Sequence, residues 1–350
     1  MSGRKIVVGM SGGVDSSVAA YLLKKQGYDV IGVTMNHWQE EECGGSSAVE
    51  DAGRVAAQLG IPYEVMDCRE EFREHVVNYF AREYREGRTP NPCVVCNRYV
   101  KWETLLRRCQ EIGADYIATG HYARIEQLAN GRYAIRNSVT AVKDQTYALY
   151  GLTQEQLART LMPVGEYTKE EIRAIAEEIG LVVAEKKDSQ EICFIPDHDY
   201  AGFIERECGS TALPGNFVST EGEILGRHRG IIHYTVGQRK GLGIAFGQPM
   251  FVVQIRPDTN EVVLGEDRDV FTDRLYANHL NFMSLSDIRE EILLKAKIRY
   301  SHAGSVCRVT RVGEDEICCE FPEPVRAVTP GQAVVLYDGD YVAAGGTILR

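Results

Sequence analysis

The sequence contains no apolar run near the roughly 18 residues that a membrane-spanning helix needs. It also lacks the start of a secretory signal, because Met-Ser-Gly-Arg-Lys leads directly into a short apolar segment. Internal repeats and low-complexity tracts are absent as well. We therefore expect a globular, cytoplasmic protein with no membrane partner.

An overall excess of basic residues is also missing. The chain has 39 Lys and Arg against 50 Asp and Glu, which gives a formal net charge of -11. This balance argues against a broadly non-specific nucleic-acid binder, because such binding rests on neutralising phosphates. The stretch 224–257 is different, since it has no acidic residue and contains Arg227, Arg229, Arg239, Lys240 and Arg256. We expect this acid-free stretch to face an anionic partner.

The length and the cysteine content set further limits. A chain of 350 residues exceeds what one hydrophobic core usually fills, so we expect two or three domains. Ten cysteines without a secretory leader indicate reduced thiols in the cytoplasm rather than a disulfide scaffold.

The first 200 or so residues alternate short apolar segments with amphipathic ones, the rhythm of βαβ units. This pattern predicts an α/β domain with a Rossmann-like, doubly wound parallel sheet. Thr168 and Glu171 form a capping box for a helix that ends at Gly180. We expect strands over 5–10, 29–35, 63–66 and 115–119, and helices over 14–26, 49–59 and 70–86.

From about Leu213 the sequence pattern changes to short runs of β-branched and aromatic residues that are separated by glycine-rich turns. This change predicts two small, mostly β domains after the first, the last of them a β-barrel. The expected division is 1–205, 206–274 and 275–350.

A glycine- and serine-rich loop, Met10–Ser17, separates the first expected strand from its helix, where backbone amides and the helix dipole favour an anion. Its two glycines permit backbone conformations that a side chain would block, and its three serines add hydroxyl donors. The loop has no Gly-Lys-Ser/Thr ending, so it is not the loop that grips a transferable γ-phosphate. The pattern Ser-Gly-Gly-x-Asp-Ser resembles the pyrophosphatase loop of enzymes that split ATP between its α and β phosphates. A glycine-rich turn with a capping serine is the structural alternative.

Cys93 and Cys96 lie three residues apart in a proline-rich stretch, Thr89–Asn97. We expect a loop just before a helix whose N-terminus favours the thiolate. Taken alone, the pair is equally typical of half a zinc site, a redox pair or two packed thiols.

Further motifs follow in order along the chain. These are Gly120-His121-Tyr122-Ala123-Arg124, Lys143-Asp144-Gln145-Thr146-Tyr147, 187–195 (Lys-Asp-Ser-Gln-Glu-Ile-Cys-Phe-Ile) and 237–243 (Gly-Gln-Arg-Lys-Gly-Leu-Gly). With the glycine-rich loop and the cysteine pair, this ordered set resembles the bacterial tRNA-specific 2-thiouridylases over the whole chain. The resemblance implies an adenine nucleotide α-hydrolase-like first domain, a tRNA-binding central domain and a C-terminal β-barrel. It also implies ATP with Mg, a tRNA with a modifiable wobble uridine, and a sulfur donor protein such as a cysteine desulfurase or a sulfur-relay protein.

In that family ATP adenylates the C2 oxygen of the wobble uridine with release of pyrophosphate, and a persulfide sulfur then displaces AMP. By motif, Cys193 matches the cysteine that bears the persulfide. Cys96 matches the nucleophile that completes the transfer, which leaves a Cys96–Cys193 disulfide to be reduced. The other cysteines outside the motifs are expected to be buried and inert; they are Cys43, Cys68, Cys109, Cys208, Cys307, Cys318 and Cys319.

The resemblance also implies binding positions. Those that match ATP contacts are Gly9, Met10, Ser11, Gly12, Gly13, Val14, Asp15, Ser16, Met35 and Gly120. Those that match contacts with the target base are Asn91, Pro92 and Cys93. Those that match other tRNA contacts are His121, Lys143, Asp144, Gln145, Arg239, Lys240, Arg299, Tyr300 and Gln332.

Simpler readings exist for some of these positions. Met35 fits a core residue at a strand end, His121 a hydrogen-bonded structural residue, and Arg299-Tyr300 an exposed strand pair. Arg239 and Lys240, together with Gln238, lie in the acid-free stretch, so charge and resemblance both indicate phosphate contact there.

One position departs from the family pattern, because many members carry Asp where this chain has Cys93. A carboxylate at that position could assist proton movement near the base, a role that a thiol does not automatically take over. Cys93, Cys96 and Cys193 also make the number of ligands that holds an iron–sulfur cluster with one open iron. Two mechanisms therefore follow from the sequence, a persulfide relay and a cluster-assisted sulfur transfer.

Two alternatives come from other classes. Another adenylating ligase with the same loop, such as an argininosuccinate-synthetase-like enzyme, would act on a small molecule, but it fits the cysteine motifs and the acid-free stretch poorly. A non-catalytic tRNA-binding or metal-binding module would use Cys93 and Cys96 as zinc ligands, yet the sequence offers no second Cys-x-x-Cys or His pair to complete the site. Pyrophosphate release that requires tRNA separates the thiolase from both.

Overall fold

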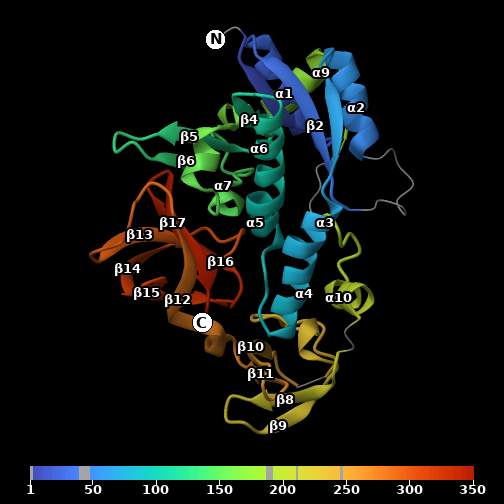
Figure 1. The fold of residues 1–350 in the computed structure, drawn as a ribbon. Helices are drawn as coiled ribbons and strands as arrows, with labels where there is room; N and C mark the ends of the chain where they lie inside the picture. The colour runs from blue at the N-terminus through green and yellow to red at the C-terminus, as the bar shows by residue number, and fades with distance from the viewer. Residues whose placement is uncertain (1–2, 39–47, 187–191, 210–211, 245–246) are drawn as a thin grey trace. The chain divides into compact units, whose positions relative to one another are not determined.

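A computed structural model describes residues 3–38, 48–186, 192–209, 212–244 and 247–350 (Figure 1). The chain forms two compact units, each assembled from separate stretches of sequence. Unit 1 comprises Met1–Val76, Cys93–Gln190 and Asp340–Ala343. Unit 2 comprises Val77–Pro92, Glu191–Gly339 and Ala344–Arg350. The three-part division expected from the sequence stays a prediction.

Unit 1 is built on a five-stranded parallel sheet with the order β3-β2-β1-β4-β7. Its strands are β1 (Lys5–Gly9), β2 (Asp29–Asn36), β3 (Tyr63–Asp67), β4 (Tyr116–Ala118) and β7 (Thr160–Leu161). The first four were expected, and the two-residue β7 was not. The strand order reverses between β1 and β4, and doubly wound sheets bind their ligands at the carboxyl ends of such strands.

Helices cover both faces of this sheet because alternate residues of β1 are buried on opposite sides. Ile6 and Val8 pack into one core with Val18 of α1. On the other face, a Cβ at Gly9 would lie 3.1 Å from a methyl group of Leu105 in α6. The doubly wound α/β class predicted from the sequence is therefore confirmed.

Most of the helices in the described parts of the chain belong to unit 1. They are α1 (Val14–Lys25), α2 (Ala48–Leu59), α3 (Arg69–Phe72), α5 (Pro92–Cys96), α6 (Trp102–Glu111), α7 (Thr146–Leu149), α8 (Gln154–Ala158), the 3-10 helix η3 (Pro163–Glu166) and α9 (Lys169–Glu178). The capping box expected at Thr168 is present, with the Thr168 hydroxyl accepting from the backbone of Glu171 and the Glu171 carboxylate accepting from that of Thr168. A hairpin of β5 (Ala123–Gln127) and β6 (Tyr133–Asn137) completes this unit.

Two long helices contain π-helical turns. The helix expected over 70–86 runs from α3 through the π-helix η1 (Arg73–Val77) into α4 (Asn78–Arg85). In the same way, α5 continues through the π-helix η2 (Asn97–Lys101) into α6. Such π-helical turns occur frequently at functional sites.

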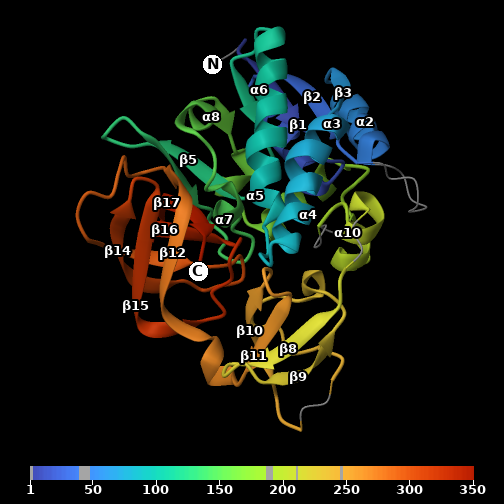
Figure 2. The same ribbon diagram turned by 60° about the horizontal axis from the view of Figure 1, so that its bottom comes forward.

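Unit 2 contains α4, α10 (Tyr200–Cys208) and a four-stranded sheet with the order β10-β11-β8-β9 (Figure 2). The sheet strands are β8 (Gly215–Ser219), β9 (Ile224–His228), β10 (Phe251–Arg256) and β11 (Glu261–Gly265). A short 3-10 helix, η4 (Ile231–His233), lies between β9 and β10 in the sequence, and a second, η5 (Asp267–Val270), follows β11. The sheet has its own small core, which includes Phe217, Tyr234 and Val252.

The C-terminal strands of the chain form a closed six-stranded barrel, as the sequence predicted. Its order is β12-β15-β14-β13-β16-β17, and β12 pairs with β17 to close it. The strands are β12 (Phe271–Phe282), β13 (Ile292–Lys297), β14 (Ser305–Gly313), β15 (Glu316–Arg326), β16 (Ala333–Asp338) and β17 (Tyr341–Ile348). The first residues of β17 belong to unit 1, where Tyr341 pairs with Arg136 of β6. None of the described helices is long and apolar enough to cross a membrane.

Candidate active site

The glycine- and serine-rich loop lies at the carboxyl end of β1, where β1 ends at Gly9 and α1 begins at Val14. The N-cap of α1 is Gly13, which has no side chain to occupy the free amides of the first turn. Backbone amides at a helix N-terminus can donate hydrogen bonds to an anion, and the helix dipole also favours a negative charge there. The loop thus has the geometry of a phosphate site.

Hydrogen bonds inside the loop fix its shape. The Ser16 hydroxyl accepts from the backbone N–H of Ser11 at 3.1 Å, and the Ser17 hydroxyl donates to the carbonyl of Gly13 at 2.7 Å. On the β2 side, Thr34 Oγ1 donates to the Met10 carbonyl at 2.7 Å. These hydrogen bonds within the chain define the conformation of the loop.

Two of the predicted glycines have no room for a side chain. Gly12 has a φ of +67°, and a Cβ there would lie 2.4 Å from the carbonyl oxygen of Ala48. A Cβ at Gly120 would lie 2.5 Å from the backbone nitrogen of Ser16. Because both close contacts are with backbone, they cannot relax by a rotamer change. The backbone after β4 therefore approaches the start of α1 directly.

Asp15 is held by two side chains that the sequence reasoning did not select. The Tyr122 hydroxyl and the Lys169 ammonium each donate to Asp15 Oδ1 at 2.7 Å. The Lys169 side chain is only 8% exposed, and the Asp15 carboxylate lies beside its ammonium. Tyr122 belongs to the motif Gly120–Arg124 that the sequence analysis described. Lys169 is the first residue of a capped helix, and no sequence motif marks it as part of a site. These contacts tie α9 and the segment after β4 to the phosphate loop.

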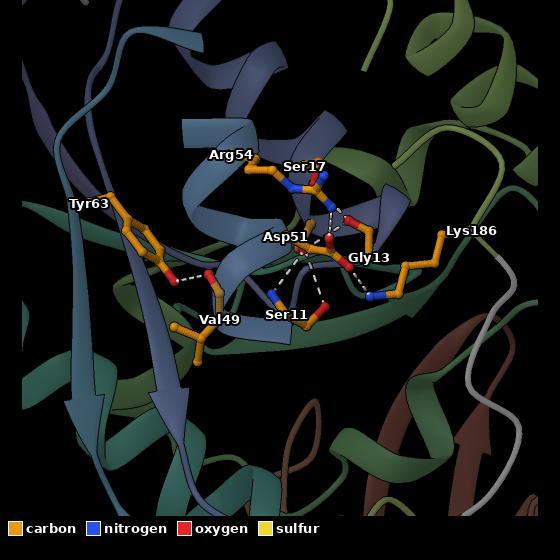
Figure 3. A network of polar contacts seen from close by, with 9 residues as sticks. Ser11, Gly13, Ser17, Val49, Asp51, Arg54, Tyr63 and Lys186 are labelled. Carbon is orange, nitrogen blue, oxygen red and sulfur yellow. Dashed lines mark hydrogen bonds and ion pairs between the residues drawn. The ribbon is translucent and has the colours of Figure 1, made fainter. Parts of the chain in front are cut away.

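The first turns of α2 form a second charged group on unit 1. Figure 3 shows Asp51 between the guanidinium of Arg54 and the ammonium of Lys186, which lies 2.6 Å from the Asp51 carboxylate. The Asp51 side chain is buried. At the start of the same helix, the Tyr63 hydroxyl donates a hydrogen bond to the carbonyl of Val49 at 2.9 Å. Sequence reasoning missed this group because its members come from three separate segments.

Cys93 and Cys96 lie within a helix, so the expectation of a loop was wrong. Pro92 is the first residue of α5, and proline is favoured at this position because its fixed φ suits a helix and its missing N–H is not needed. Residues at i and i+3 share one face of a helix, so both thiols belong to the same face.

Cys93 is exposed at the surface, and the desolvation that its neighbours impose raises the pKa of its thiol, with an opposing effect of the Lys101 charge. The Cys96 side chain is buried. Within the described ranges, no group of three or more His, Cys, Asp or Glu residues is arranged to hold a metal ion.

Cys193 belongs to unit 2 and is exposed. The two residues after it, Phe194 and Ile195, are buried. The Phe194 ring lies 5.6 Å from that of Phe80 and 5.2 Å from that of Phe203. Burial of these neighbours fixes the chain just after the exposed thiol. Residues 187–191 of the same motif lie outside the described residues.

The cysteines that match no motif were expected to be buried, and they are buried where the structure describes their side chains. Cys68, Cys109, Cys307, Cys318 and Cys319 are all buried. Cys43 and the side chain of Cys208 lie outside the described part of the chain.

Among the residues expected to contact tRNA in unit 1, several have partners within the chain. Asp144 accepts from the backbone of Ser138 at 2.8 Å and of Thr146 at 3.1 Å. Gln145 Oε1 accepts from the backbone N–H of Tyr122 at 2.8 Å. These side chains build the turn that carries Lys143, and their contact with tRNA stays a prediction.

His121 packs against the ring of Trp102, with 5.5 Å between ring centroids, and Thr119 Oγ1 lies 2.9 Å from its Nδ1. Desolvation, with a smaller effect of Lys101, lowers the pKa of His121 to about 3. The imidazole is therefore neutral at physiological pH, so a contact with tRNA would use hydrogen bonding or stacking rather than charge.

In unit 2, Arg239 and Lys240 are exposed, and neither makes an ion pair with another described residue. Arg299 and Tyr300 follow β13 in a turn rather than forming part of a strand, and Arg299 donates to the carbonyl of Arg326 at 3.2 Å. Gln332 has backbone partners within the same unit.

Asn91 is half-buried and Pro92 is buried. Met35, in unit 1, is half-buried near the end of β2.

A parallel sheet with an order reversal, and a glycine-rich loop at the start of a helix at that point, define a nucleotide-binding α/β domain. Two β structures, a four-stranded sheet and a barrel, follow it in the sequence. The chain matches the models of a tRNA methyl transferase HUP domain over residues 4–197, a tRNA methyl transferase PRC-barrel domain over 201–266 and an aminomethyltransferase β-barrel domain over 272–348.

Among curated proteins, the chain is 65% identical to the tRNA-specific 2-thiouridylase MnmA of Lachnoclostridium phytofermentans, with 99% of this chain and 100% of that protein covered. It is 54% identical to the protein of the same name from Clostridioides difficile, with 99% and 98% covered. It is 53% identical to that from Clostridium acetobutylicum, with 99% of each covered. The chain belongs to the tRNA-specific 2-thiouridylase family.

Proposed function

We propose that this chain is an ATP-dependent tRNA sulfurtransferase that places sulfur on C2 of the wobble uridine. The observation that carries the proposal is the loop Gly9–Ser16, which contains the crowded Gly12 and is approached by the crowded Gly120 after β4. This arrangement suits a nucleotide phosphate at the order reversal of the sheet. Full-length membership of the 2-thiouridylase family supplies the substrate class. ATP would bind here together with Mg. The other residues proposed to contact ATP are Ser11, Met35 and the rest of the loop Gly9–Ser16.

In the first step, the C2 oxygen of uridine attacks the α phosphate of ATP, and the bond to the β phosphate breaks as pyrophosphate leaves. The amide-like carbonyl is a poor electrophile, and adenylation turns its oxygen into a good leaving group. In unit 1, Asp15 is fixed by Tyr122 and Lys169, which supports its role in holding the loop around the phosphates.

In the second step, the terminal sulfur of a persulfide on Cys193 attacks C2, and AMP departs. The thiolate of Cys96 then attacks Cys193 Sγ and breaks the S–S bond, which leaves sulfur on the base and a Cys96–Cys193 disulfide. A thiol reductant must supply two electrons to reset the enzyme, and a sulfur donor protein must reload Cys193. The exposure of Cys193 supports this assignment, because its sulfur must be loaded by another protein.

A cluster-assisted transfer is the second candidate. Cys93 and Cys96 share one helical face and would provide two of its three cysteine ligands, with Cys193 as the third, but among the described residues no three such side chains are grouped around a metal position. In that case the cluster would bind and deliver the sulfur, and no cysteine persulfide would be required.

Variants of the three cysteines test the proposal. With the persulfide relay, Cys193→Ser should abolish thiolation yet retain tRNA-dependent pyrophosphate release, because activation of the base does not need the sulfur carrier. Cys96→Ser should accumulate a persulfide on Cys193, detectable by mass spectrometry after incubation with a sulfur donor. Cys307→Ser, at a buried position far from any motif, is the matched control. Pyrophosphate release that is independent of tRNA would contradict the proposed activity.

Cys93→Asp separates the two mechanisms. It restores the carboxylate common in the family and removes one potential iron ligand. Activity in metal-free Cys93→Asp enzyme would support the relay. Activity of the unmodified enzyme that requires reconstituted iron, and is lost in Cys93→Asp, would instead assign the three cysteines to a cluster.

A further inference from the structure

Lys169 is a buried lysine in the first turn of α9, where the helix dipole favours negative rather than positive charge. Burial of an ammonium group also costs solvation free energy. The next two residues, Glu170 and Glu171, follow the usual preference of a first turn and are exposed. The stability of α9 therefore does not explain why a lysine occupies this position.

The partner of Lys169 is Asp15, the second residue of α1. The Lys169 ammonium and the Tyr122 hydroxyl each donate to the same carboxylate oxygen, Asp15 Oδ1, at 2.7 Å. The ammonium also lies 5.9 Å from the centroid of the Tyr122 ring. Because two donors from separate segments converge on one oxygen, the carboxylate has little freedom to rotate. Lys169 and Tyr122 together fix the orientation of Asp15.

The helix that carries Lys169 is itself packed against the helix that carries Asp15. Val18 of α1 shares one buried core with Ile172 and Ala176 of α9, and Tyr122 belongs to the same core. Since protein interiors are close-packed, a shift of α9 along α1 would open voids in this core. The Lys169 ammonium is thus presented to Asp15 by a fixed element.

Asp15 connects this contact to the phosphate loop. It directly precedes Ser16, whose hydroxyl accepts from the Ser11 N–H at 3.1 Å and lies 3.2 Å from the Ser11 hydroxyl. From the side of β4, a Cβ at Gly120 would lie 2.7 Å from the carbonyl carbon of Asp15. Asp15 is also the only charged residue in the stretch 9–17. Its carboxylate is therefore the group through which α9 holds the end of the loop.

We propose that Lys169 is a positioning residue for nucleotide binding, which acts through Asp15 to hold the phosphate loop in the conformation that receives ATP. Its ammonium serves the Asp15 carboxylate rather than a phosphate oxygen. This inference deepens the proposed function and rests on the assignment of the loop Gly9–Ser16 to ATP. A lysine beside a phosphate loop is commonly a direct phosphate ligand, and the two roles give different results when Asp15 is changed as well.

A double-mutant cycle separates the two roles. Lys169→Met keeps the approximate length of the side chain and removes the ammonium, whereas Asp15→Asn keeps an oxygen acceptor for Tyr122 and removes the charge. The probe is an ATP analogue with a methylene group between its α and β phosphates. Lys169→Met should raise the Kd of this analogue roughly tenfold, the effect of losing one hydrogen bond to a charged group.

In the Asp15→Asn background, Lys169→Met should change the Kd by less than about twofold, because the group on which it acts has already been altered. An equal loss of affinity in both backgrounds would overturn the proposal and make Lys169 a phosphate ligand. Tyr122→Phe removes the other donor to Asp15 Oδ1, and it should raise the Kd only when Asp15 is intact. This variant keeps its ring in the core, so it carries the same test if Lys169→Met fails to fold.

Lys24→Met is the matched control, because it removes a lysine from the last turn of the helix that begins with Val14 and Asp15. Lys24 lies about 13 Å from Asp15 along the helix axis, which exceeds the screening length of about 8 Å at physiological ionic strength. The Kd of the analogue should therefore stay within about twofold of wild type in this variant.

Urea unfolding of the same variants distinguishes positioning from a purely structural role. A structural role alone would lower the unfolding free energy of Lys169→Met and leave the Kd of the folded protein unchanged, which would overturn the proposal. Failure of the wild-type protein to bind the analogue would overturn the ATP site and the role of Lys169 together. Binding by wild type with the same Kd in Lys169→Met and Tyr122→Phe would overturn only the role of Lys169.

Discussion

Gly12 and Gly13 are neighbours in the phosphate loop, yet only Gly12 is sterically required. A Cβ at Gly12 would contact the Ala48 carbonyl at 2.4 Å with φ at +67°, whereas a Cβ at Gly13 would meet only the Ser11 hydroxyl at an ordinary 3.5 Å. The left-handed backbone alone costs a non-glycine residue about 1–2 kcal/mol, which corresponds to roughly tenfold in rate.

We therefore expect Gly12→Ala to lower tRNA-dependent pyrophosphate release by about tenfold or more, because the clash with Ala48 adds to the backbone cost. Gly13→Ala, the matched control, should stay within about threefold of wild type, since its Cβ meets no backbone atom. Equal losses in both variants would show that loop flexibility, rather than steric room, is what the reaction needs.

His121 is the residue whose charge state matters most for interpreting a contact with tRNA. Its pKa is lowered to about 3 by desolvation, so the folded protein favours the neutral imidazole. Since the unfolded pKa is near 6.5, the stability that this residue contributes is fully present above about pH 6.5 and is lost as the pH falls toward 3.

We expect wild type to lose more unfolding free energy than His121→Gln when urea titrations are moved from pH 7.5 to pH 5. The difference arises because unfolding of the wild-type protein then takes up a proton at this position. The pH dependence of tRNA affinity should be the same in both proteins between pH 6 and 8. A titration step in affinity near pH 6.5 that disappears in His121→Gln would contradict a neutral imidazole.

At the scale of elements, the acid-free stretch 224–257 offers exposed cations within an acidic chain. We expect Arg239→Ala with Lys240→Ala to weaken tRNA binding and to reduce the slope of log Kd against log salt concentration by about one for each lost phosphate contact. The matched control is Arg268→Ala in the same unit, because Arg268 is exposed but lies 3.3 Å from the Glu266 carboxylate. An unchanged slope in the double variant would leave the stretch as a solvated surface.

Elements with a clear period were predictable from the sequence, and side-chain partners were not. The helix over 14–26 and the strand over 29–35 were confirmed within one or two residues, because their apolar spacing and glycine stops act locally. The cysteine segment was expected to be a loop just before a helix because it is rich in proline. Pro92 instead begins a helix, as proline does at this position when no amide is needed.

The side-chain contacts that hold the residues of the site in place join residues that are distant in sequence. Lys169 reaches Asp15 across 154 positions, and Gln332 reaches Thr89 across 243. No local pattern encodes such pairs, because they depend on how the sheet and the barrel bring separate segments together. Motif resemblance singled out Gln332 but could not say which groups its amide contacts within the chain.

At the scale of the molecule, every residue expected to contact ATP belongs to unit 1. A ligand stabilises the part of a protein that binds it, by about 2.7 kcal/mol at a hundred times its Kd. With a non-hydrolysable ATP analogue, we expect hydrogen exchange to slow in 9–17 and 116–121 and to stay unchanged in the barrel strands 305–326. Equal protection of the barrel would mean that nucleotide binding is coupled to unit 2.

Strand β17 has a consequence for how such a chain is recombined. Its first residues pair with the hairpin of unit 1 through Tyr341 and Arg136, and its later residues close the barrel against β12, with Ile348 opposite Ala277. A chimera joined at the sequence boundary before the barrel would bring in a foreign strand end to pair with the resident hairpin. Exchange of the barrel between homologues should therefore give a folded protein only when β5, β6 and β17 come from the same parent. The three consecutive sequence segments are thus less independent of one another than their order in the sequence suggests.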